Sequence, residues 1–316
     1  PEEHTRQWQK EMFEMIDRLR FYPCITTWVV FNEGWGQHNT VEIVNKVIKY
    51  DDTRLINGVT GWTDRGVGDM YDVHNYPVTS MILPENNGNR ISVLGEFGGY
   101  GWAIKEHIWN PNMRNWGYKN IDGAMALIDS YGRLVYDLET LIAQGLSAAV
   151  YTQTTDVEGE VNGLITYDRK VTKIPEGLLH LMHNRLYEIT PAKAVTLIAD
   201  GQNGSKNTRL VSLNGQELKM TSLPFECPPR STVVSEATFK VDKDFNHLSL
   251  WLNVAGEAKV WLNGVEVFAQ EAKQTRQYNQ YNISDYSRYL RKGSNLLRIE
   301  VKDSKKMRFD YGLRAY

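Results

Sequence analysis

The sequence predicts an α/β unit with a parallel sheet over residues 1–190, followed by an all-β sandwich over residues 191–316. In the first part, short runs rich in β-branched and aromatic residues alternate with segments of helical hydrophobic spacing, which is typical of parallel sheets. In the second part, alternating apolar and polar residues flank Asn-Gly dipeptides at residues 214–215 and 263–264, as in antiparallel hairpins. A chain of 316 residues is long enough to form two domains.

The first elements follow from hydrophobic spacing. Apolar residues recur at helical spacing over residues 2–20, and residues 25–31 (ITTWVVF) predict a strand that is buried on both faces. Asn39 and Glu42 have the spacing of a capping box, which predicts the start of another helix. The apolar face expected for this helix consists of Val41, Val44, Val47 and Ile48.

The alternation continues through the rest of the first part. Four further apolar runs are predicted strands, at residues 54–59, 70–74, 91–95 and 146–152. A long helical pattern covers residues 122–143 and ends near Gly145, a residue type that often terminates helices. A last helix has Pro175 in its first turn. The residues that we expect this helix to bury are Leu178, Leu179, Met182 and Leu186.

The second part has the period-two alternation of half-buried strands. The expected core positions are Leu248, Leu250, Leu252, Val254, Val260, Leu262, Leu297, Ile299 and Val301. Turn residues separate these runs, and about 110 residues of this pattern predict an antiparallel β-sandwich.

Composition excludes several classes of function. The formal net charge is −2, so there is no electrostatic reason to expect nucleic acid or an anionic membrane as a partner. No apolar run approaches the roughly 20 residues that a membrane-spanning helix needs. Cys24 and Cys227 lie far apart, which gives no indication of a disulfide framework. Nine Trp and seventeen Tyr suit sugar rings, although an aromatic core explains them equally well.

Two glutamates stand directly after predicted buried strands. Glu33 follows WVVFN and Glu96 follows ISVLG, and each is followed by a glycine and an aromatic residue. The C-terminal ends of barrel strands converge on one mouth, so both carboxyls can reach one cleft. Hydrolysis of a glycosidic bond with retention needs one protonated and one ionised carboxyl. A single glutamate of this kind can be a helix cap or an ion-pair partner, but two in the same setting favour a catalytic pair.

Three motifs resemble glycoside hydrolase family 2, which includes β-galactosidases, β-mannosidases and β-glucuronidases. Asn32-Glu33 resembles the acid/base motif after the fourth strand of barrel glycosidases. The sequence LGEFGG around Glu96 resembles the nucleophile motif after the seventh strand of the family, and residues 151–170 resemble the eighth strand and its loop in a bacterial branch. The resemblance implies that residues 1–190 form a partial TIM barrel, strands four to eight with their helices.

The resemblance also implies roles for individual residues. Glu33 would be the general acid/base and Glu96 the nucleophile, while Asn32 would bind the sugar 2-hydroxyl. His74 and Tyr76 would line the cleft, with Tyr76 donating to Glu96, although a packing role is the alternative for both. The other predicted substrate contacts are Trp35, Trp102, Tyr151 and Gln153. Further candidate platforms for sugar rings are Trp62, Trp109 and Trp116.

The predicted eighth strand departs from the family pattern, because Tyr151 and Gln153 stand where many barrel glycosidases carry a tryptophan. The loop that follows contains Asp156, Glu158 and Asn162, which we interpret as a solvated acidic loop. The alternative is a site for a cation or a substrate hydroxyl. The sequence has no zinc-like His/Cys cluster, no phosphate-binding glycine loop and no serine nucleophile motif. We therefore expect no metal and no cofactor.

The barrel resemblance has a consequence for stability. If Glu33 follows strand four, then strands one to three are absent. An open five-stranded parallel sheet would leave backbone groups of its outer strands unpaired and part of its core uncovered. We therefore expect a truncated fragment with little activity alone, whose missing barrel half comes from a parent chain or is replaced by self-association.

The C-terminal part resembles the galactose-binding-like jelly-roll modules attached to many glycosidases, through AKVWLNGVEVF and YLRKGSNLLRIEV. Sugar binding and a scaffold role both stay open for it. The leading hypothesis for the chain is a retaining β-glycosidase acting on a carbohydrate, with β-galactosides as the first guess because they are common substrates in the family. The alternatives are a noncatalytic carbohydrate-binding or scaffold fragment and a barrel glycosidase of another family. The resemblance implies a periplasmic or secreted bacterial protein.

Overall fold

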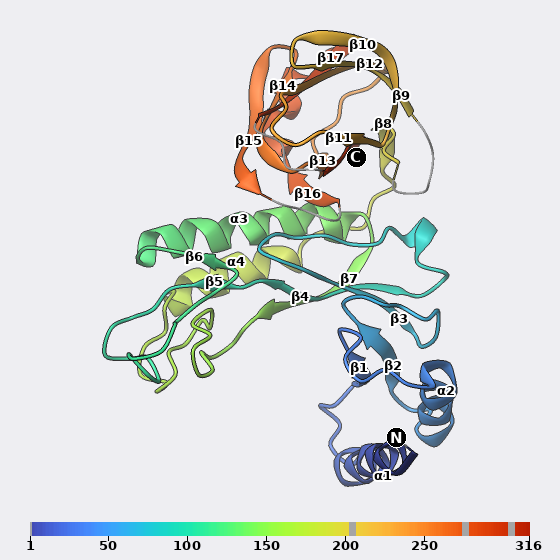
Figure 1. Cartoon of the computed structure of the whole chain (residues 1–316), viewed down its shortest axis with the longest axis vertical. Coiled ribbons are helices and arrows are strands. Elements are labelled where there is room, and N and C mark those ends of the chain that lie inside the picture. The colour runs from blue at the N-terminus through green and yellow to red at the C-terminus, as the bar shows by residue number, and fades with distance from the viewer. Residues whose placement is uncertain (1, 202–206, 274–277, 303–306) are drawn as a thin grey trace. The chain divides into compact units, whose positions relative to one another are not determined.

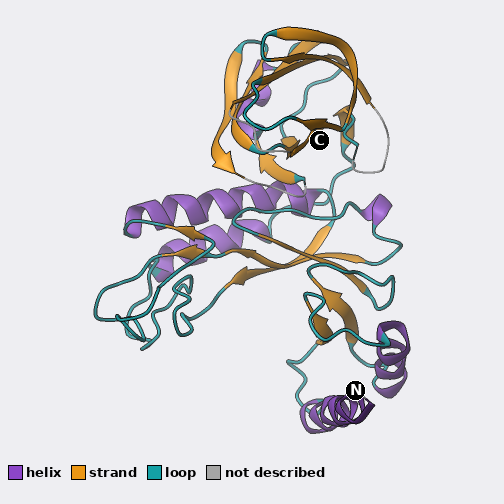
Figure 2. Cartoon of the chain, viewed as in Figure 1, coloured by secondary structure: helices purple, strands orange, loops and turns teal. Residues whose placement is uncertain are grey.

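The chain divides into two compact units, seen in a computed structural model (Figure 1). The structure describes residues 2–201, 207–273, 278–302 and 307–316. The first unit consists of residues 1–132 and 145–182, and the second of residues 133–144 and 183–316. Helices are concentrated in the first part of the chain and strands in the last (Figure 2). None of the helices in the described part combines the length and apolar character that a membrane crossing requires.

The first unit begins with two helices and two parallel strands. Their order is α1 (Glu2–Leu19), β1 (Thr27–Asn32), α2 (Thr40–Tyr50) and β2 (Leu55–Thr60). Trp28 of β1 lies opposite Ile56 of β2 in the parallel register. Both strands share a buried apolar cluster with α1 and α2, to which the helices contribute Ile16 and Val44. The four predicted elements therefore exist, with bounds within two residues of those expected.

The rest of the first unit is built on a three-stranded parallel sheet. The strand order is β3 (Met70–Asn75), β4 (Ile91–Gly98) and β7 (Leu146–Thr152). A short 3-10 helix, η1 (Pro84–Asn86), connects β3 to β4. The segment between β4 and β7 contains β5 (Tyr100–Gly101), β6 (Lys119–Asn120) and α3 (Ala124–Ala143). Helix α4 (Glu176–Leu186) follows β7.

The expectation of one continuous five-stranded sheet is wrong. The five predicted strands form separate parallel sheets of two and three strands, because β2 and β3 do not share a ladder. Isolated bonds join β2 to β3 and to the residue before it. The backbone N–H of Asp69 donates to the carbonyl of Ile56, and the Asp69 carboxylate accepts from the backbone N–H of Ile56, each at 2.7 Å. Asn57 donates to Asp72 at 2.6 Å. The partial TIM barrel stays a prediction.

The start of α2 also differs from the prediction. Asn39 precedes the helix in the left-handed conformation (φ 43°, ψ 38°), and its side chain makes no capping hydrogen bond. A capping side chain normally requires extended backbone to reach the first turn, so the predicted capping box does not form. Val41 is 49% exposed, whereas Ile43 is buried. The buried face therefore runs through Thr40, Ile43, Val44 and Val47.

Helix α4 forms where it is predicted, but it buries none of its residues. Leu178 is 37% exposed and Leu181 is 64% exposed. Pro175 begins the helix as expected, since its carbonyl accepts from the backbone N–H groups of Leu178 and Leu179. Leucine is a good helix former without being buried, so local propensity explains the helix. The predicted burial is incomplete: Leu179, Met182 and Leu186 are half-buried, and the Met182 side chain lies close to Gly132 of α3.

The last part of the chain is an antiparallel sandwich of two sheets. One sheet has the order β10 (Gln216–Leu223), β9 (Asn207–Leu213), β12 (Val233–Val241), β17 (Gly293–Lys302), β14 (Gly256–Leu262) and β15 (Val265–Lys273). The other has the order β11 (Phe225–Cys227), β18 (Met307–Ala315), β13 (Leu248–Asn253) and β16 (Asn279–Asn282), with β8 (Val195–Ile198) also paired to β18. A 3-10 helix, η2 (Ser284–Tyr289), lies between β16 and β17.

The predicted sandwich core is confirmed. All nine expected positions, from Leu248 to Val301, are at most 1% exposed. The Asn-Gly dipeptides form the predicted hairpin turns, and all four of their residues have positive φ, as such turns require. Strand β13 is buried along its whole length. Within the second unit, the C-terminal half of α3 also contacts this sheet, since Asp137 accepts from the backbone N–H of Asn282 at 2.8 Å.

Candidate active site

Glu33 is the first residue after β1 and has a strained backbone. Its backbone N–H donates to the carbonyl of Thr60 at the end of β2 (3.2 Å), so it continues the parallel pairing. Its φ is 52°, in the left-handed region that costs a non-glycine residue about 1 kcal/mol. Glycines surround it in the turn that follows, where Gly34 and Gly36 also have positive φ. Strain of this kind is characteristic of functional positions.

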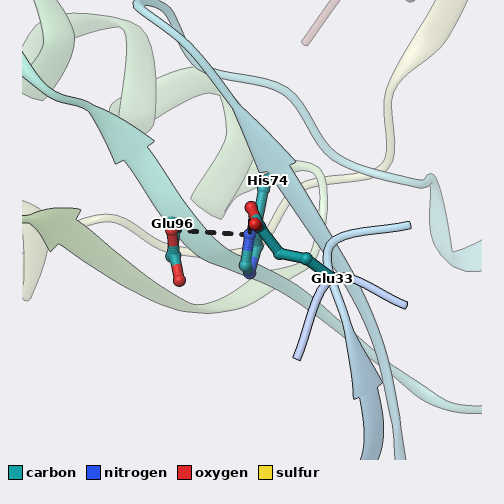
Figure 3. A group of neighbouring side chains, drawn as sticks. All are labelled: Glu33, His74 and Glu96. Atoms are coloured by element: carbon teal, nitrogen blue, oxygen red, sulfur yellow. Dashed lines mark hydrogen bonds and ion pairs between the residues drawn. The ribbon is translucent and has the colours of Figure 1, made fainter. Parts of the chain in front are cut away.

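Glu33, His74 and Glu96 point toward one another from three different strands (Figure 3). The Nδ1 atom of His74 lies 2.8 Å from a carboxylate oxygen of Glu33 and 3.5 Å from one of Glu96. One oxygen of each carboxylate and the histidine nitrogen all lie within 4.8 Å of one another. The fold thus brings together the two glutamates that the sequence predicts as a pair, with a buried imidazole in contact with both.

Tyr76 provides the hydrogen bond that was expected on Glu96. Its hydroxyl donates to Oε2 of Glu96 and also lies 2.9 Å from the hydroxyl of Thr152, at the end of β7. Burial and the hydrogen bond to Glu96 raise the pKa of Tyr76 far above its ordinary value. Tyr76 therefore stays protonated and presents an O–H donor to this carboxylate.

Tyr118 belongs to the site and was missed by the sequence analysis. It comes from the long segment after β4, is 46% exposed, and stacks on the ring of Tyr76. Burial raises its pKa, and the negative charges of Glu160 and Glu33 raise it further. Its backbone N–H donates to the carbonyl of Gly99, where a Cβ would lie 2.5 Å from the Tyr118 ring. A tyrosine in a nonperiodic loop carries no sequence signal for this placement.

Two predicted substrate contacts, Asn32 and Trp35, flank Glu33. The side-chain oxygen of Asn32 accepts from the hydroxyl of Thr60, which holds the amide at the end of β1. Trp35 is 76% exposed, and its backbone N–H donates to the carbonyl of Asn32. Trp62 is 50% exposed and lies edge-on to the His74 ring, with centroids 6.0 Å apart. Aromatic faces of the kind that bind sugars are therefore available beside the carboxylates.

Three other residues predicted to contact substrate make hydrogen bonds within the protein. The hydroxyl of Tyr151 accepts from the backbone N–H of Tyr100 at 3.2 Å. Gln153 donates to Asn162 at 2.8 Å. The backbone carbonyl of Trp102 accepts from the ammonium of Lys173. These contacts hold the loops around the site, and a role of these residues in binding substrate stays a prediction.

The loop after β7 is not the solvated acidic loop that was expected. Asp156 is 3% exposed and pairs with the buried ammonium of Lys173 at 2.7 Å. Lys173 also donates to the carbonyls of Trp102 and Val161, each at 2.9 Å. Burial raises the pKa of Asp156 and lowers that of Lys173, while the bond between them opposes both shifts. The ammonium group of Lys173 is thus the cation bound by Asp156, the residue considered above as part of a cation site.

Glu33, His74 and Glu96 form the one cluster in the described part of the chain whose atoms are close enough to hold a metal ion. Two carboxylates and an imidazole can bind a divalent transition metal. In this structure Glu33 and Glu96 already have partners, His74 and Tyr76. One surface hollow of the first unit lies at the opposite end of β1 and β2, lined by residues that include Ile25 and Arg54. It contains none of the three clustered side chains.

The comparisons with known proteins give a limited likeness. No protein-family model and no curated protein sequence matches the chain. Among solved structures, it is similar to an FMN-binding β-glucuronidase from Faecalibacterium prausnitzii L2-6 (17% identity, TM-score 0.30, 39% of this chain and 23% of that one). It is also similar to a β-D-glucuronidase from Dictyoglomus thermophilum (12%, TM-score 0.28, 36% and 20%). A β-D-mannosidase from the same organism is 11% identical, with a TM-score of 0.27, over 35% of this chain and 16% of that one.

The matched segments span less than a quarter of each of these three known chains. The likeness is to parts of glycoside hydrolases. Because the TM-scores do not exceed 0.30 in these comparisons, the case for function is made from the geometry of the cluster alone.

Proposed function

We propose that the first unit carries the active site of a retaining β-glycosidase of family 2 type. The observation that carries the proposal is the separation of the two glutamates, whose nearest carboxylate oxygens lie within 4.8 Å. Retaining glycosidases place their carboxyl groups about 5–5.5 Å apart, whereas inverting enzymes need about 6.5–9.5 Å to admit a water molecule. The spacing here supports direct attack by one carboxylate on the sugar.

The surroundings of the two carboxyls support a division of roles. Glu96 accepts from the hydroxyl of Tyr76, which orients this carboxyl group for attack on the sugar. Glu33 faces Nδ1 of His74, a group that can hold its carboxyl in place while the proton moves. We therefore assign Glu33 as the general acid/base and Glu96 as the nucleophile.

The reaction then has two displacements. In the first, Glu96 attacks the anomeric carbon, the bond to the leaving oxygen breaks, and Glu33 gives its proton to that oxygen. In the second, Glu33 takes a proton from water, and the water oxygen displaces Glu96 from the anomeric carbon. The sugar leaves with its original configuration, and both carboxyls return to their starting states.

The aromatic residues around the pair support a carbohydrate as the substrate. Trp62 is exposed and lies edge-on to His74, Tyr118 is exposed and stacks on Tyr76, and Trp35 is an exposed ring two positions after Glu33. We propose β-galactosides as the first class to test. Asn32, on the strand that ends at Glu33, is the proposed partner of the sugar 2-hydroxyl.

The test is hydrolysis of a panel of 4-nitrophenyl β-glycosides, with galactoside, glucoside, mannoside and glucuronide as members. The chain is compared with Glu96→Gln and with Glu42→Gln, whose target is an exposed glutamate paired with Lys46. We expect weak hydrolysis of one member of the panel, its loss in Glu96→Gln and its retention in Glu42→Gln. A 2-deoxy-2-fluoro glycoside with a good leaving group should label Glu96 covalently, as read by peptide mass spectrometry.

Other outcomes point away from a catalytic pair. Sugar binding without turnover or labelling, unchanged in Glu96→Gln, would favour the alternative of a noncatalytic carbohydrate-binding fragment. Turnover that persists in Glu96→Gln would refute the assignment of the nucleophile.

A further inference from the structure

Asp72 is a buried carboxylate that ties together the strands that carry the site. It lies on β3 and is 3% exposed. It accepts from the side chain of Asn57 on β2 at 2.6 Å and from the backbone N–H of Gly95 on β4 at 2.9 Å. The backbone N–H of Gly61, just after β2, is a third donor. Since β2 and β3 have no ladder of their own, this side chain makes a connection that backbone groups usually make.

The contact with Gly95 coincides with an irregularity in β4. Val73 pairs with Leu94 and His74 pairs with Glu96, so Gly95 is an extra residue on β4. A β-bulge of this kind releases a backbone N–H from the ladder and redirects the neighbouring side chain. Here the released N–H donates to Asp72, and the redirected side chain is that of Glu96. The bulge therefore determines where the proposed nucleophile points.

Gly95 is required for this arrangement. A Cβ at this position would lie 2.2 Å from one carboxylate oxygen of Asp72 and 2.3 Å from the other. Any side chain at position 95 would displace the carboxylate from the N–H that it binds.

Asp72 also lies behind His74. The two residues are two positions apart on β3, so their side chains leave the same face of the strand. The Nε2 atom of His74 is 3.8 Å from a carboxylate oxygen of Asp72, while its Nδ1 atom faces Glu33. Gly61 leaves room for the imidazole, since a Cβ there would come within 2.9 Å of the ring. The Asp72 carboxylate thus lies next to the His74 ring and accepts from the backbone N–H of Gly95, the residue before Glu96.

We propose that Asp72 is a positioning residue that fixes the bulge at Gly95 and the imidazole of His74, and so sets the placement of Glu96 relative to Glu33. The proposal rests on the proposed glycosidase function. It does not require Asp72 to touch the substrate. A misplacement of reacting groups by about 1 Å can cost on the order of 10²-fold in rate, which sets the size of the expected effect.

The kinetic test uses Asp72→Ala, Gly95→Ala and the isosteric Asp72→Asn. We expect the first two to lower kcat by about 10²-fold with KM changed less than about threefold, because the bulge is lost but the substrate-binding groups remain. The matched control is Asp51→Asn. Asp51 is another buried aspartate of the first unit, bonded to the Trp28 indole at the far end of β1. Its variant should leave kcat unchanged.

A double exchange separates positioning from simple loss of stability. In Asp72→Asn one carboxylate oxygen becomes an NH2 group, so with Asn57 in its present orientation the side chain cannot accept from both Asn57 and the Gly95 N–H. Exchange to Asn57→Asp with Asp72→Asn restores the bond between the side chains at positions 57 and 72 and leaves an oxygen for the Gly95 N–H. We expect the exchange to recover at least about tenfold of the kcat lost in Asp72→Asn, a tenfold change being about 1.4 kcal/mol of barrier. No recovery, or a kcat for Asp72→Ala equal to that of Asp51→Asn, would overturn the proposal.

A spectroscopic measurement covers the case in which the wild-type chain neither hydrolyses nor is labelled. That result would reject the proposed function, and the positioning role would then be judged from NMR spectra alone. We expect the Gly95 amide proton to lose its downfield shift and exchange protection in Asp72→Ala, and to lose them at least in part in Asp72→Asn. Spectra of residues 95–97 that match the wild type would overturn the proposal. Asp72→Asn preserves the side-chain volume and serves as the folded variant if Asp72→Ala does not fold.

Discussion

The rings of Tyr76 and Tyr118 are parallel, with centroids 3.6 Å apart and an angle of 3° between their planes. Tyr118 thereby covers the residue that donates to Glu96. The stack joins a strand-end residue, whose position is set by the sheet, to a loop residue some forty positions later in the sequence.

Tyr76→Phe should keep the stack and remove the hydrogen bond to Glu96. We expect kcat/KM on the best substrate of the glycoside panel to fall by about 10²-fold, because the lost donor orients the carboxylate as it attacks the sugar. Steady-state kinetics measure this effect. Tyr118→Phe is the control, since it preserves the aromatic face; a loss as large as that of Tyr76→Phe would show that the hydroxyl of Tyr76 has no special role.

The loss of rate in Glu33→Gln should depend on the leaving group of the substrate. An acid/base residue contributes about 10²–10⁴-fold when the leaving group needs a proton. We expect a loss of that size for alkyl β-glycosides and a much smaller loss in the first step for dinitrophenyl glycosides, whose leaving group needs no proton. Pre-steady-state kinetics separate the two steps. An equal loss for both leaving groups would contradict the role assigned to Glu33.

Lys173→Met should destabilise the first unit strongly. The ammonium and the carboxylate of Asp156 are both buried, so removing one partner leaves an uncompensated charge at a cost of about 3–5 kcal/mol. Chemical denaturation measures this loss. The double variant Lys173→Met with Asp156→Leu should lose less than the sum of the single variants; strict additivity would mean that the two charges do not interact.

The stability difference between the wild type and Asp72→Asn should depend on pH. Burial raises the pKa of Asp72, although the bond from Asn57 and the charge of His74 partly oppose the shift. The folded state then binds a proton more tightly than the unfolded state, so the free energy of unfolding that this group contributes falls as pH rises from about 4 through the folded pKa. Asp72→Asn has no titrating carboxyl group at this position and so lacks this pH-dependent contribution. Its stability relative to the wild type should therefore improve between pH 4 and pH 7 in denaturant titrations, and a constant difference would contradict the raised pKa.

The two cysteines should react very differently with thiol reagents. Cys24 is exposed, whereas Cys227 is buried, and burial raises the pKa of Cys227 to about 12. At pH 8 only about 10⁻⁴ of the Cys227 thiol would be ionised, and the thiolate is the reactive form. We expect one rapid equivalent with Ellman's reagent in the native protein and a second only after denaturation. Cys24→Ser should abolish the rapid phase.

Much of the fold could be predicted from local pattern. The sandwich core residues and both Asn-Gly turns are as expected, because strict alternation and positive-φ turns are properties of short segments. The start of α2 could not be predicted correctly in the same way. Asn39 has the right spacing for a cap, but the turn that begins at Glu33 places it in the left-handed region.

The sequence by itself determined which residues carry the candidate chemistry. Glu33 directly follows β1 and Glu96 lies near the C-terminal end of β4, and parallel strands present these ends on one side of a sheet. Tyr76 was also identified as the partner of Glu96, through its place in the family-like segment after β3. These assignments depend on order along the chain, which a sequence contains.

The tertiary structure alone decided how these residues are held. The bulge at Gly95, the buried Asp72, the stack of Tyr118 and the pairing of Lys173 with Asp156 all join segments that are distant in sequence. A buried polar group must find a partner, but its sequence context does not say which strand or loop supplies that partner. For that reason Asp156 was predicted to lie in a solvated loop, and the sequence analysis assigned no role to Asp72.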